Sequence, residues 1–198
     1  MEIRLDWLAR LSCQRIHELF TNLSRVGLPK IATVMPSTMF GRFSGGESER
    51  VALILEAAKQ AEYVDVGLEM DSGSVRGCLE AITCEGKAEV ILSMHSMRPL
   101  PKEGIQKIAR HDCGLGCIHK IVMPAESLAD NLVALDACLS LKDLRRIIFC
   151  YGCNGAASRV LSPLFGSEWT YASLRRGKES APGQLDIEAV RNAQEAFS

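Results

Sequence analysis

Short apolar segments alternate with longer segments of helical periodicity along the whole chain, and this alternation constrains the fold more than any other feature. Such alternation is typical of parallel strands joined by crossover helices, so we expect an α/β protein. The predicted strands are 30–34, 63–68, 89–94, 118–123, 146–150 and 169–172. The predicted helices are 13–26, 47–61, 74–85, 101–111, 127–141, 156–164 and 186–196, with caps at Ser74, Ser127 and Asp186.

A closed barrel is the architecture that we expect from these strands. Residues 2–5 have the pattern of a strand end, which brings the predicted strands to seven of the eight that a (β/α)8 TIM barrel requires. We therefore expect a TIM barrel that lacks its N-terminal strand and helix in this chain. A doubly wound open sheet is the alternative arrangement for the same alternation.

The composition indicates one domain, because 198 residues of which 47% are apolar can bury a single core. We expect residues 1–198 to form this domain. The 23 basic and 24 acidic side chains are spread along the chain and give a net charge of −1, which argues against binding to nucleic acid or to an anionic membrane. The sequence has neither a long apolar run nor a signal peptide, so we expect a cytoplasmic protein with a small-molecule ligand.

Eight cysteines occur in the chain, most of them among apolar residues. We interpret them as reduced, buried thiols, because nothing in the sequence indicates secretion. Cys113, Cys117, Cys150 and Cys153 are the set that could bind a metal. Their spacing lacks paired C-x-x-C motifs and a histidine ligand, so we do not expect a metal site there.

Lys120 is unusual because it lies in the middle of an apolar predicted strand. Burial disfavours the ammonium form, so a lysine in such a strand loses its proton readily and can attack a carbonyl carbon. The alternative is that its side chain extends from the strand end into solvent.

His95 follows the preceding predicted strand and precedes a loop with two prolines. In a barrel this place is at the catalytic face, where His95 can converge with Lys120 from the neighbouring strand. Histidine is suited to general acid–base catalysis near neutral pH. We expect His17, His111 and His119 to be structural, and His119 to point away from Lys120 on the same strand.

Two segments near the C-terminus carry candidate binding groups. Residues 152–159 follow a predicted strand and open a helix, so backbone amides and Arg159 could together hold an anion. Residues 180–184 contain a Pro-Gly turn, and Ser180 and Gln184 could hydrogen-bond a polyhydroxylated ligand as part of a lid.

Together these residues resemble type I 3-dehydroquinate dehydratase, the Schiff-base-forming enzyme of the shikimate pathway. The resemblance runs through nearly the whole chain. Its motifs are EIRLD at 2–6, GRFSGGE at 41–47, YVDV at 63–66, SMH at 93–95, HKI at 119–121, SR at 158–159, FGS at 165–167, TY at 170–171 and SAPGQ at 180–184. Each motif alone is weak, but their order and spacing together are specific.

The resemblance implies roles for most of the site. Lys120 corresponds to the lysine that condenses with the C3 ketone of 3-dehydroquinate. His95 corresponds to the base that removes a C2 proton and then, as an acid, assists loss of the C1 hydroxyl as water. The implied substrate-binding residues are Glu2, Arg4, Arg159, Ser180 and Gln184, with Arg159 as the clamp for the substrate carboxylate. The resemblance also implies a homodimer.

The chain departs from the family pattern at four positions. Met35 lies where the family usually has an arginine, and Met39 where a glutamate commonly orients the catalytic histidine. Gly67 replaces a common strand glutamate, and Ser96 replaces an Asp or Asn. Because supporting polar groups strongly affect rate, the alternative function is a truncated or catalytically impaired barrel that binds ligand or partner without efficient turnover. A third interpretation is another Schiff-base lyase or aldolase on the same scaffold.

Overall fold

The computed structural model describes residues 1–111 and 116–197, and the chain divides into two compact units, Met1–Ser93 and Met94–Ser198. The strands of the described residues are β1 (Glu2–Arg4), β2 (Ile31–Thr33), β3 (Tyr63–Gly67), β4 (Glu89–His95), β5 (Ile118–Pro124) and β6 (Arg146–Tyr151). They form a six-stranded sheet in chain order, with parallel pairing from β1 to β4 and between β5 and β6. The expected α/β alternation is confirmed. A doubly wound sheet would instead reverse its strand order at a switch point.

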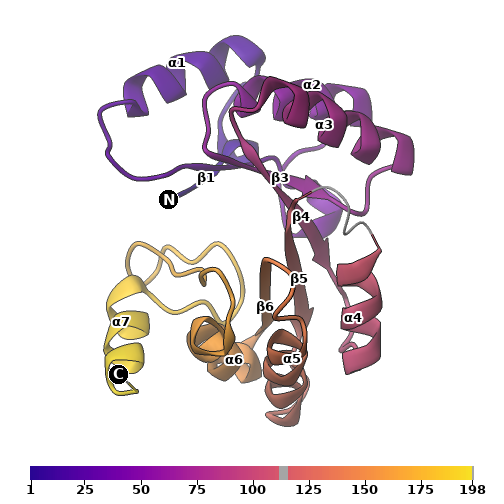
Figure 1. Ribbon diagram of the computed structural model, residues 1–198. Helices are drawn as coiled ribbons and strands as arrows, with labels where there is room; N and C mark the ends of the chain where they lie inside the picture. The colour runs from indigo at the N-terminus through magenta and orange to yellow at the C-terminus, as the bar shows by residue number, and fades with distance from the viewer. Residues whose placement is uncertain (112–115, 198) are drawn as a thin grey trace. The chain divides into compact units, whose positions relative to one another are not determined.

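Three helices cover the strands of the first unit: α1 (Cys13–Leu23), α2 (Glu47–Ala58) and α3 (Ser72–Glu85). Figure 1 shows them on one side of β1 and β3, and α2 packs against both α1 and α3. Ser12 caps α1 and Asp71 caps α3, each by accepting a hydrogen bond from a backbone amide of the first turn. Leu53 and Ile82 are nearly fully buried, and burial of such side chains contributes about 2 kcal/mol each.

The second unit contains α4 (Lys102–Arg110), α5 (Ala129–Ser140), α6 (Ala156–Leu161) and α7 (Ile187–Glu195). Helices α4 and α5 pack against β5 and β6 (Figure 1), where Ile121, Ile148 and Cys150 belong to one buried cluster. Side chains alternate across a strand, so Lys120 and Phe149 point to the opposite face of the sheet. One face of β5 and β6 therefore packs against the helices, and the other face carries the side chains that can contact a ligand.

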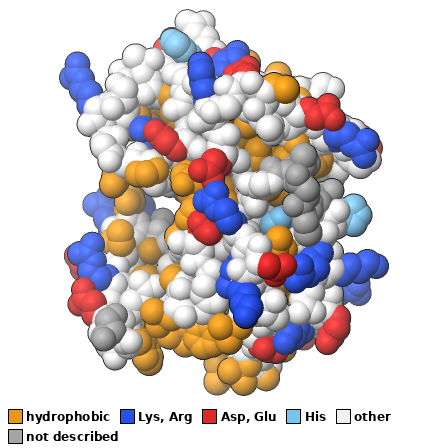
Figure 2. All heavy atoms as spheres, in the orientation of Figure 1, with side chains coloured by type: hydrophobic (Ala, Val, Ile, Leu, Met, Phe, Trp, Pro, Cys, Tyr) orange, Lys and Arg blue, Asp and Glu red, His pale blue; other side chains and the backbone are white. Residues whose placement is uncertain are grey.

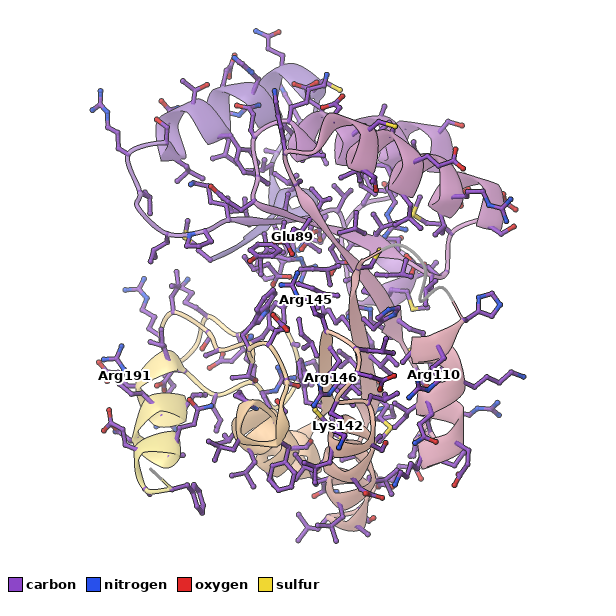
Figure 3. All side chains as sticks on the ribbon, in the orientation of Figure 1. Glu89, Arg110, Lys142, Arg145, Arg146 and Arg191 are labelled. Atoms are coloured by element: carbon purple, nitrogen blue, oxygen red, sulfur yellow. The ribbon has the colours of Figure 1, made fainter. Side chains whose placement is uncertain are left out.

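Arg146 begins β6 and connects it to neighbouring elements (Figure 3). Its guanidinium donates to the carbonyl oxygens of Cys138 at 2.5 Å, Leu144 at 3.0 Å and Phe165 at 3.4 Å. A Cβ at Gly166 would overlap this guanidinium, and Gly166 has a φ of 94°, so glycine is required there. The arginine thereby fixes the start of β6 relative to α5.

The predicted strand at 169–172 is wrong, because these residues lie outside the sheet. The amide of Glu168 still donates to the carbonyl of Arg146, as in a ladder. The chain then turns towards α6, where the hydroxyl of Thr170 donates to the carbonyl of Arg159 at 2.6 Å. Bonds to α6 replace strand pairing in this segment, so the sheet has six strands within the described residues and not the seven that we expected.

Two predicted helix starts are also displaced. Helix α3 begins at Ser72 and is capped by Asp71, not by Ser74. Helix α5 begins at Ala129, whereas Ser127 donates to the carboxylate of Asp130. Asp186 caps α7 as predicted.

Within 1–111 and 116–197, every helix is too short or too polar to cross a membrane.

Candidate active site

Glu2 and Arg4, the candidate substrate contacts of the first unit, are both held by neighbouring side chains. The hydroxyl of Thr33 donates to Glu2 Oε1 at 3.0 Å. Arg4 donates through Nε and Nη2 to the two carboxylate oxygens of Asp6, at 2.9 and 2.8 Å. Burial alone would lower the pKa of Arg4, but the hydrogen bond and charge of Asp6 outweigh it and raise the pKa. The guanidinium is therefore a fixed positive charge with a defined orientation.

Asp6 also organises the loop that follows β2. Its carboxylate accepts from the amide of Met35 at 3.4 Å and from that of Arg42 at 3.0 Å. The guanidinium carbons of Arg4 and Arg42 lie 5.4 and 4.4 Å from the ring centre of Trp7. The period-two pattern of Glu2, Arg4 and Asp6 is the sequence signal that would have identified Asp6 as part of this cluster.

The positions where the chain departs from the family pattern have distinct environments. Met35 is buried, and Met39 is half-buried in the short 3-10 helix Ser37–Met39. A Cβ at Gly67 would overlap the carboxylate of Glu69, which pairs with Arg50 at 2.6 Å. The space next to Gly67 therefore contains a carboxylate from two residues further along the chain.

Lys120 lies in the middle of β5 and is only 4% exposed, so of the two alternatives for its side chain the structure shows burial and not extension into solvent. Its Nζ lies 4.6 Å from the ring centre of Tyr171. Lys120 is in register with Ile147 of β6. His119 is buried as well, and alternation directs it to the other face of the strand.

His95 is the last residue of β4 and is half-buried. The next residue, Ser96, donates its amide to the carbonyl of Val122 at 2.8 Å, which places the end of β4 beside β5. The carbonyl of Ser96 accepts from the hydroxyl of Tyr151 at 3.2 Å. The strand end that carries His95 is thus fixed beside the strand that carries Lys120.

Arg159 lies on α6 and is 2% exposed. Its guanidinium carbon lies 4.5 Å from the ring centre of Phe149, and Nη1 donates to the carbonyl of Tyr171 at 3.4 Å. The ring centres of Phe149 and Tyr171 are 6.0 Å apart. Arg159 and Lys120 therefore contact the two members of one aromatic pair, which sequence reasoning missed because the four residues are far apart in the chain.

The expectation that backbone amides of 152–159 hold an anion is wrong for three of them, because they already have protein acceptors. The amide of Gly152 donates to the carbonyl of Pro182 at 3.0 Å, and that of Gly155 to the carbonyl of Gly152. The amide of Ser158 donates to Asn131 Oδ1 at 2.9 Å. These bonds shape the turn, so these three amides are not available to an anion, and anion binding by Arg159 stays a prediction.

Ser180 and Gln184 are brought together in one turn. Gln184 Oε1 accepts from the amide of Ser180 at 2.8 Å and from its hydroxyl at 3.2 Å, and Gln184 is buried. The bond from Gly152 to Pro182 attaches this turn to the end of β6. The turn with the candidate lid residues is thus bonded to the end of β6, the strand that carries Phe149.

The cysteines are free thiols wherever the structure describes them. Cys117 and Cys150 are buried and Cys153 is exposed, whereas Cys113 lies outside the described residues. Among residues 1–111 and 116–197, no group of three or more His, Cys, Asp or Glu side chains is arranged to hold a metal ion. Burial raises the pKa of the Cys150 thiol to about 11.

The predicted site residues divide between the two units. Glu2 and Arg4 belong to the first unit, together with Thr33 and Asp6. The candidate residues of the second unit are His95, Lys120, Arg159, Ser180 and Gln184. A buried amine on a strand, a histidine at the end of the adjacent strand and a buried guanidinium suit chemistry on a carbonyl compound that carries an anionic group.

Solved structures share this arrangement of strands and helices. A type I 3-dehydroquinate dehydratase from Clostridium difficile has a TM-score of 0.89 and 21% identity, with 99% of this chain and 80% of that chain covered. A 3-dehydroquinate dehydratase from Aquifex aeolicus has a TM-score of 0.82 and 28% identity, with 100% of this chain and 87% of that chain covered. The protein is therefore an α/β protein of the (β/α)8 barrel class, as the sequence predicts.

Sequence comparisons define the family more narrowly. The family model described as type I 3-dehydroquinase matches residues 1–197. A 3-dehydroquinate dehydratase from Methanothermobacter thermautotrophicus is 35% identical over 192 residues, which cover 96% of this chain and 81% of that protein. One from Methanococcoides burtonii is 32% identical over 198 residues, which cover 98% and 83%. The chain belongs to the type I 3-dehydroquinase family.

Proposed function

We propose that the protein is a hydro-lyase that converts 3-dehydroquinate to 3-dehydroshikimate and water, a step of the shikimate pathway of aromatic amino acid biosynthesis. Family membership supports the reaction. The observation that carries the mechanism is the burial of Lys120 on β5, beside the strand end with His95. The family match across residues 1–197 supports one domain over the whole chain.

In the proposed mechanism the amine of Lys120 attacks the C3 carbonyl carbon. A C–N bond forms, and the carbonyl oxygen leaves as water with one proton from the nitrogen and one from a general acid. His95 then takes a proton from C2, and the electron pair of the C–H bond moves into an enamine. The enamine pair expels the C1 hydroxyl, which leaves as water with the proton that His95 returns. Hydrolysis of the new iminium releases product and the free amine.

The binding residues complete this proposal. Arg159 clamps the substrate carboxylate, because a buried guanidinium presents a planar, permanently charged donor set. Ser180 and Gln184 contact substrate from the lid, and Glu2 and Arg4 contact its polar groups from β1. The mechanism needs neither a metal nor an organic cofactor, since the protonated imine itself withdraws electrons from C2. We propose that the enzyme acts in the cytoplasm.

We also propose a homodimer. Four leucines on α5, just before it and on the 3-10 helix Ser162–Phe165 are exposed, and Figure 2 shows apolar side chains gathered there. They are Leu128, Leu132, Leu139 and Leu164. The net charge of −1 gives two copies little mutual repulsion. Sedimentation equilibrium is expected to give twice the chain mass for the native protein and the chain mass for Leu132→Lys; a native monomer contradicts the proposal.

Borohydride trapping tests the covalent step. The protein is incubated with 3-dehydroquinate and sodium borohydride, and its intact mass is measured. We expect a mass increase that corresponds to the reduced substrate imine, and we expect Lys120→Ala to show none. If the native protein forms no adduct, the Schiff-base proposal fails, and an adduct on Lys120→Ala shows that another amine reacts.

A second candidate function is substrate capture with little turnover, which is favoured by the methionines at positions 35 and 39. Ultraviolet absorbance of the conjugated enone separates the two functions. A working dehydratase accumulates product over many turnovers, whereas a capturing protein forms the adduct and produces no more than one equivalent. A covalent adduct with a different carbonyl compound and none with 3-dehydroquinate would instead indicate another Schiff-base lyase or an aldolase.

A further inference from the structure

The side-chain nitrogen of Lys120 faces an aromatic ring. Nζ lies 4.6 Å from the ring centre of Tyr171, and Lys120 is almost fully buried. The face of an aromatic ring attracts a cation, and the attraction is stronger where water is scarce. This contact therefore favours the positively charged forms of the Lys120 nitrogen over the neutral form.

The Tyr171 ring is held in this place by other residues of the candidate site. It lies 6.0 Å from the ring of Phe149 at an interplanar angle of 47°, a tilted geometry that suits aromatic pairs. The backbone on either side of Tyr171 is fixed as well. Its own carbonyl accepts from Arg159 at 3.4 Å, and the hydroxyl of Thr170 donates to the carbonyl of Arg159.

We infer that Tyr171 is a positioning residue that holds the Lys120 nitrogen and stabilises its charge as ammonium and as iminium, an inference that rests on the proposed Schiff-base dehydration. The iminium is the form that accepts the electron pair of the C2–H bond when His95 removes the proton. A ring whose face lies against this nitrogen supports that step without donating or accepting a proton. The role belongs to the ring face and not to the hydroxyl of Tyr171.

Three variants at this position separate the ring from the rest of the side chain. Tyr171→Leu removes the ring, and Tyr171→Phe keeps it without the hydroxyl. A trifluorophenylalanine at position 171, introduced by nonsense suppression, keeps the shape of phenylalanine but weakens the negative potential of the ring face. Tyr63→Leu is the matched control, because Tyr63 lies at the start of β3 in the first unit. Each protein is assayed for kcat, KM and borohydride trapping, and its thermal unfolding is recorded.

We expect Tyr171→Leu to lower kcat about tenfold, which corresponds to about 1.4 kcal/mol, with little change in KM. Tyr171→Phe is expected to restore most of that loss, and the fluorinated ring to restore less than phenylalanine does. Tyr63→Leu is expected to trap substrate as the native protein does. If Tyr171→Leu does not fold, the comparison of phenylalanine with its fluorinated form decides the question.

Several results overturn the inference while leaving the proposed function intact. One is a native protein that traps substrate together with a Tyr171→Leu variant of unchanged kcat. Another is a Tyr171→Phe variant as impaired as Tyr171→Leu, because the hydroxyl would then be responsible. Equal activity of the phenylalanine and fluorinated proteins also overturns it. Failure of the native protein to trap 3-dehydroquinate counts against the proposed Schiff base itself.

Discussion

Gly183 approaches Gly152 so closely that a Cβ on Gly183 would overlap the carbonyl oxygen of Gly152. Gly183 also has a φ of 71°, a backbone conformation that side chains with a Cβ seldom adopt. Next to this contact, the amide of Gly152 donates to the carbonyl of Pro182. The turn that carries Ser180 and Gln184 is therefore attached to the end of β6 at a point where only glycine fits.

Gly183→Ala is expected to raise KM for 3-dehydroquinate at least about tenfold, because the added methyl group forces the turn away from β6. The matched control is Gly86→Ala, since Gly86 also has a positive φ, of 64°, but open space around its Cβ position. That control is expected to lose about 1 kcal/mol of stability with an unchanged KM. Steady-state kinetics and urea unfolding provide both measurements, and equal KM values for the two variants would contradict the attachment.

Asp6→Ala is expected to lower the free energy of unfolding by about 3 kcal/mol, because it leaves the guanidinium of Arg4 without its carboxylate in a largely buried place. The comparison is Asp136→Ala, which removes an exposed partner of Lys102 and is expected to cost less than about 1 kcal/mol. Urea unfolding measures both values. Similar losses in the two variants would mean that Asp6 contributes no more than a surface charge.

Arg159→Lys is expected to raise KM at least about tenfold with a smaller effect on kcat, because lysine cannot reproduce the planar, bidentate donors of arginine. The control is Arg110→Lys on α4, where the guanidinium pairs with Asp143 at the surface (Figure 3). Kinetics with 3-dehydroquinate measure the effect. A loss confined to kcat would show that Arg159 acts on the reacting atoms and not on binding.

Cys150 is expected to resist alkylation at pH 8, because burial holds its thiol pKa at about 11 and the thiolate is the reactive form. Iodoacetamide followed by peptide mass analysis is expected to modify the exposed Cys13, Cys84 and Cys153 first.

The raised pKa of Cys150 also predicts a pH dependence of the free energy of unfolding. Below about pH 8.5, the pKa of a thiol in an unfolded chain, the Cys150 thiol is protonated in both states and the protein keeps its full stability. Between about pH 8.5 and 11 the thiol ionises in the unfolded chain only, so the free energy of unfolding falls as the pH rises. A Cys150→Ala variant is expected to lose this alkaline dependence, and its persistence would assign the dependence to another group.

The strands β2 to β6 were predictable because parallel strands buried on both faces have nearly continuous apolar sequences. Residues 169–172 include Trp, Thr and Tyr, which favour strands equally, yet they do not pair in the sheet. Their bonds go to Arg159, and no local pattern contains that information. The predicted start of α3 was wrong for a simpler reason. Asp71 and Ser74 are both residue types that cap helices well, and the sequence alone does not show which of them has the backbone conformation of a cap.

The candidate site was predictable to a similar extent. An apolar strand indicates a buried Lys120, and a strand end indicates the position of His95, so their places in the fold follow from local sequence. The partners of these residues depend on contacts between distant parts of the chain. Tyr171 was visible as part of a wrongly predicted strand and of the TY motif, without its contact to Lys120, and Phe149 only as one apolar residue of β6 among several.

Asp6 links the orientation of the Arg4 guanidinium to the length of the loop at residues 35–42. The same carboxylate holds the guanidinium of Arg4 and accepts the amides of Met35 and Arg42 at the two ends of a loop. An insertion or deletion in that loop would move the acceptor, and with it the direction of a positive charge. The length of residues 35–42 is thereby linked to the electrostatics of β1, so that substitutions within this loop are tolerated more readily than changes in its length.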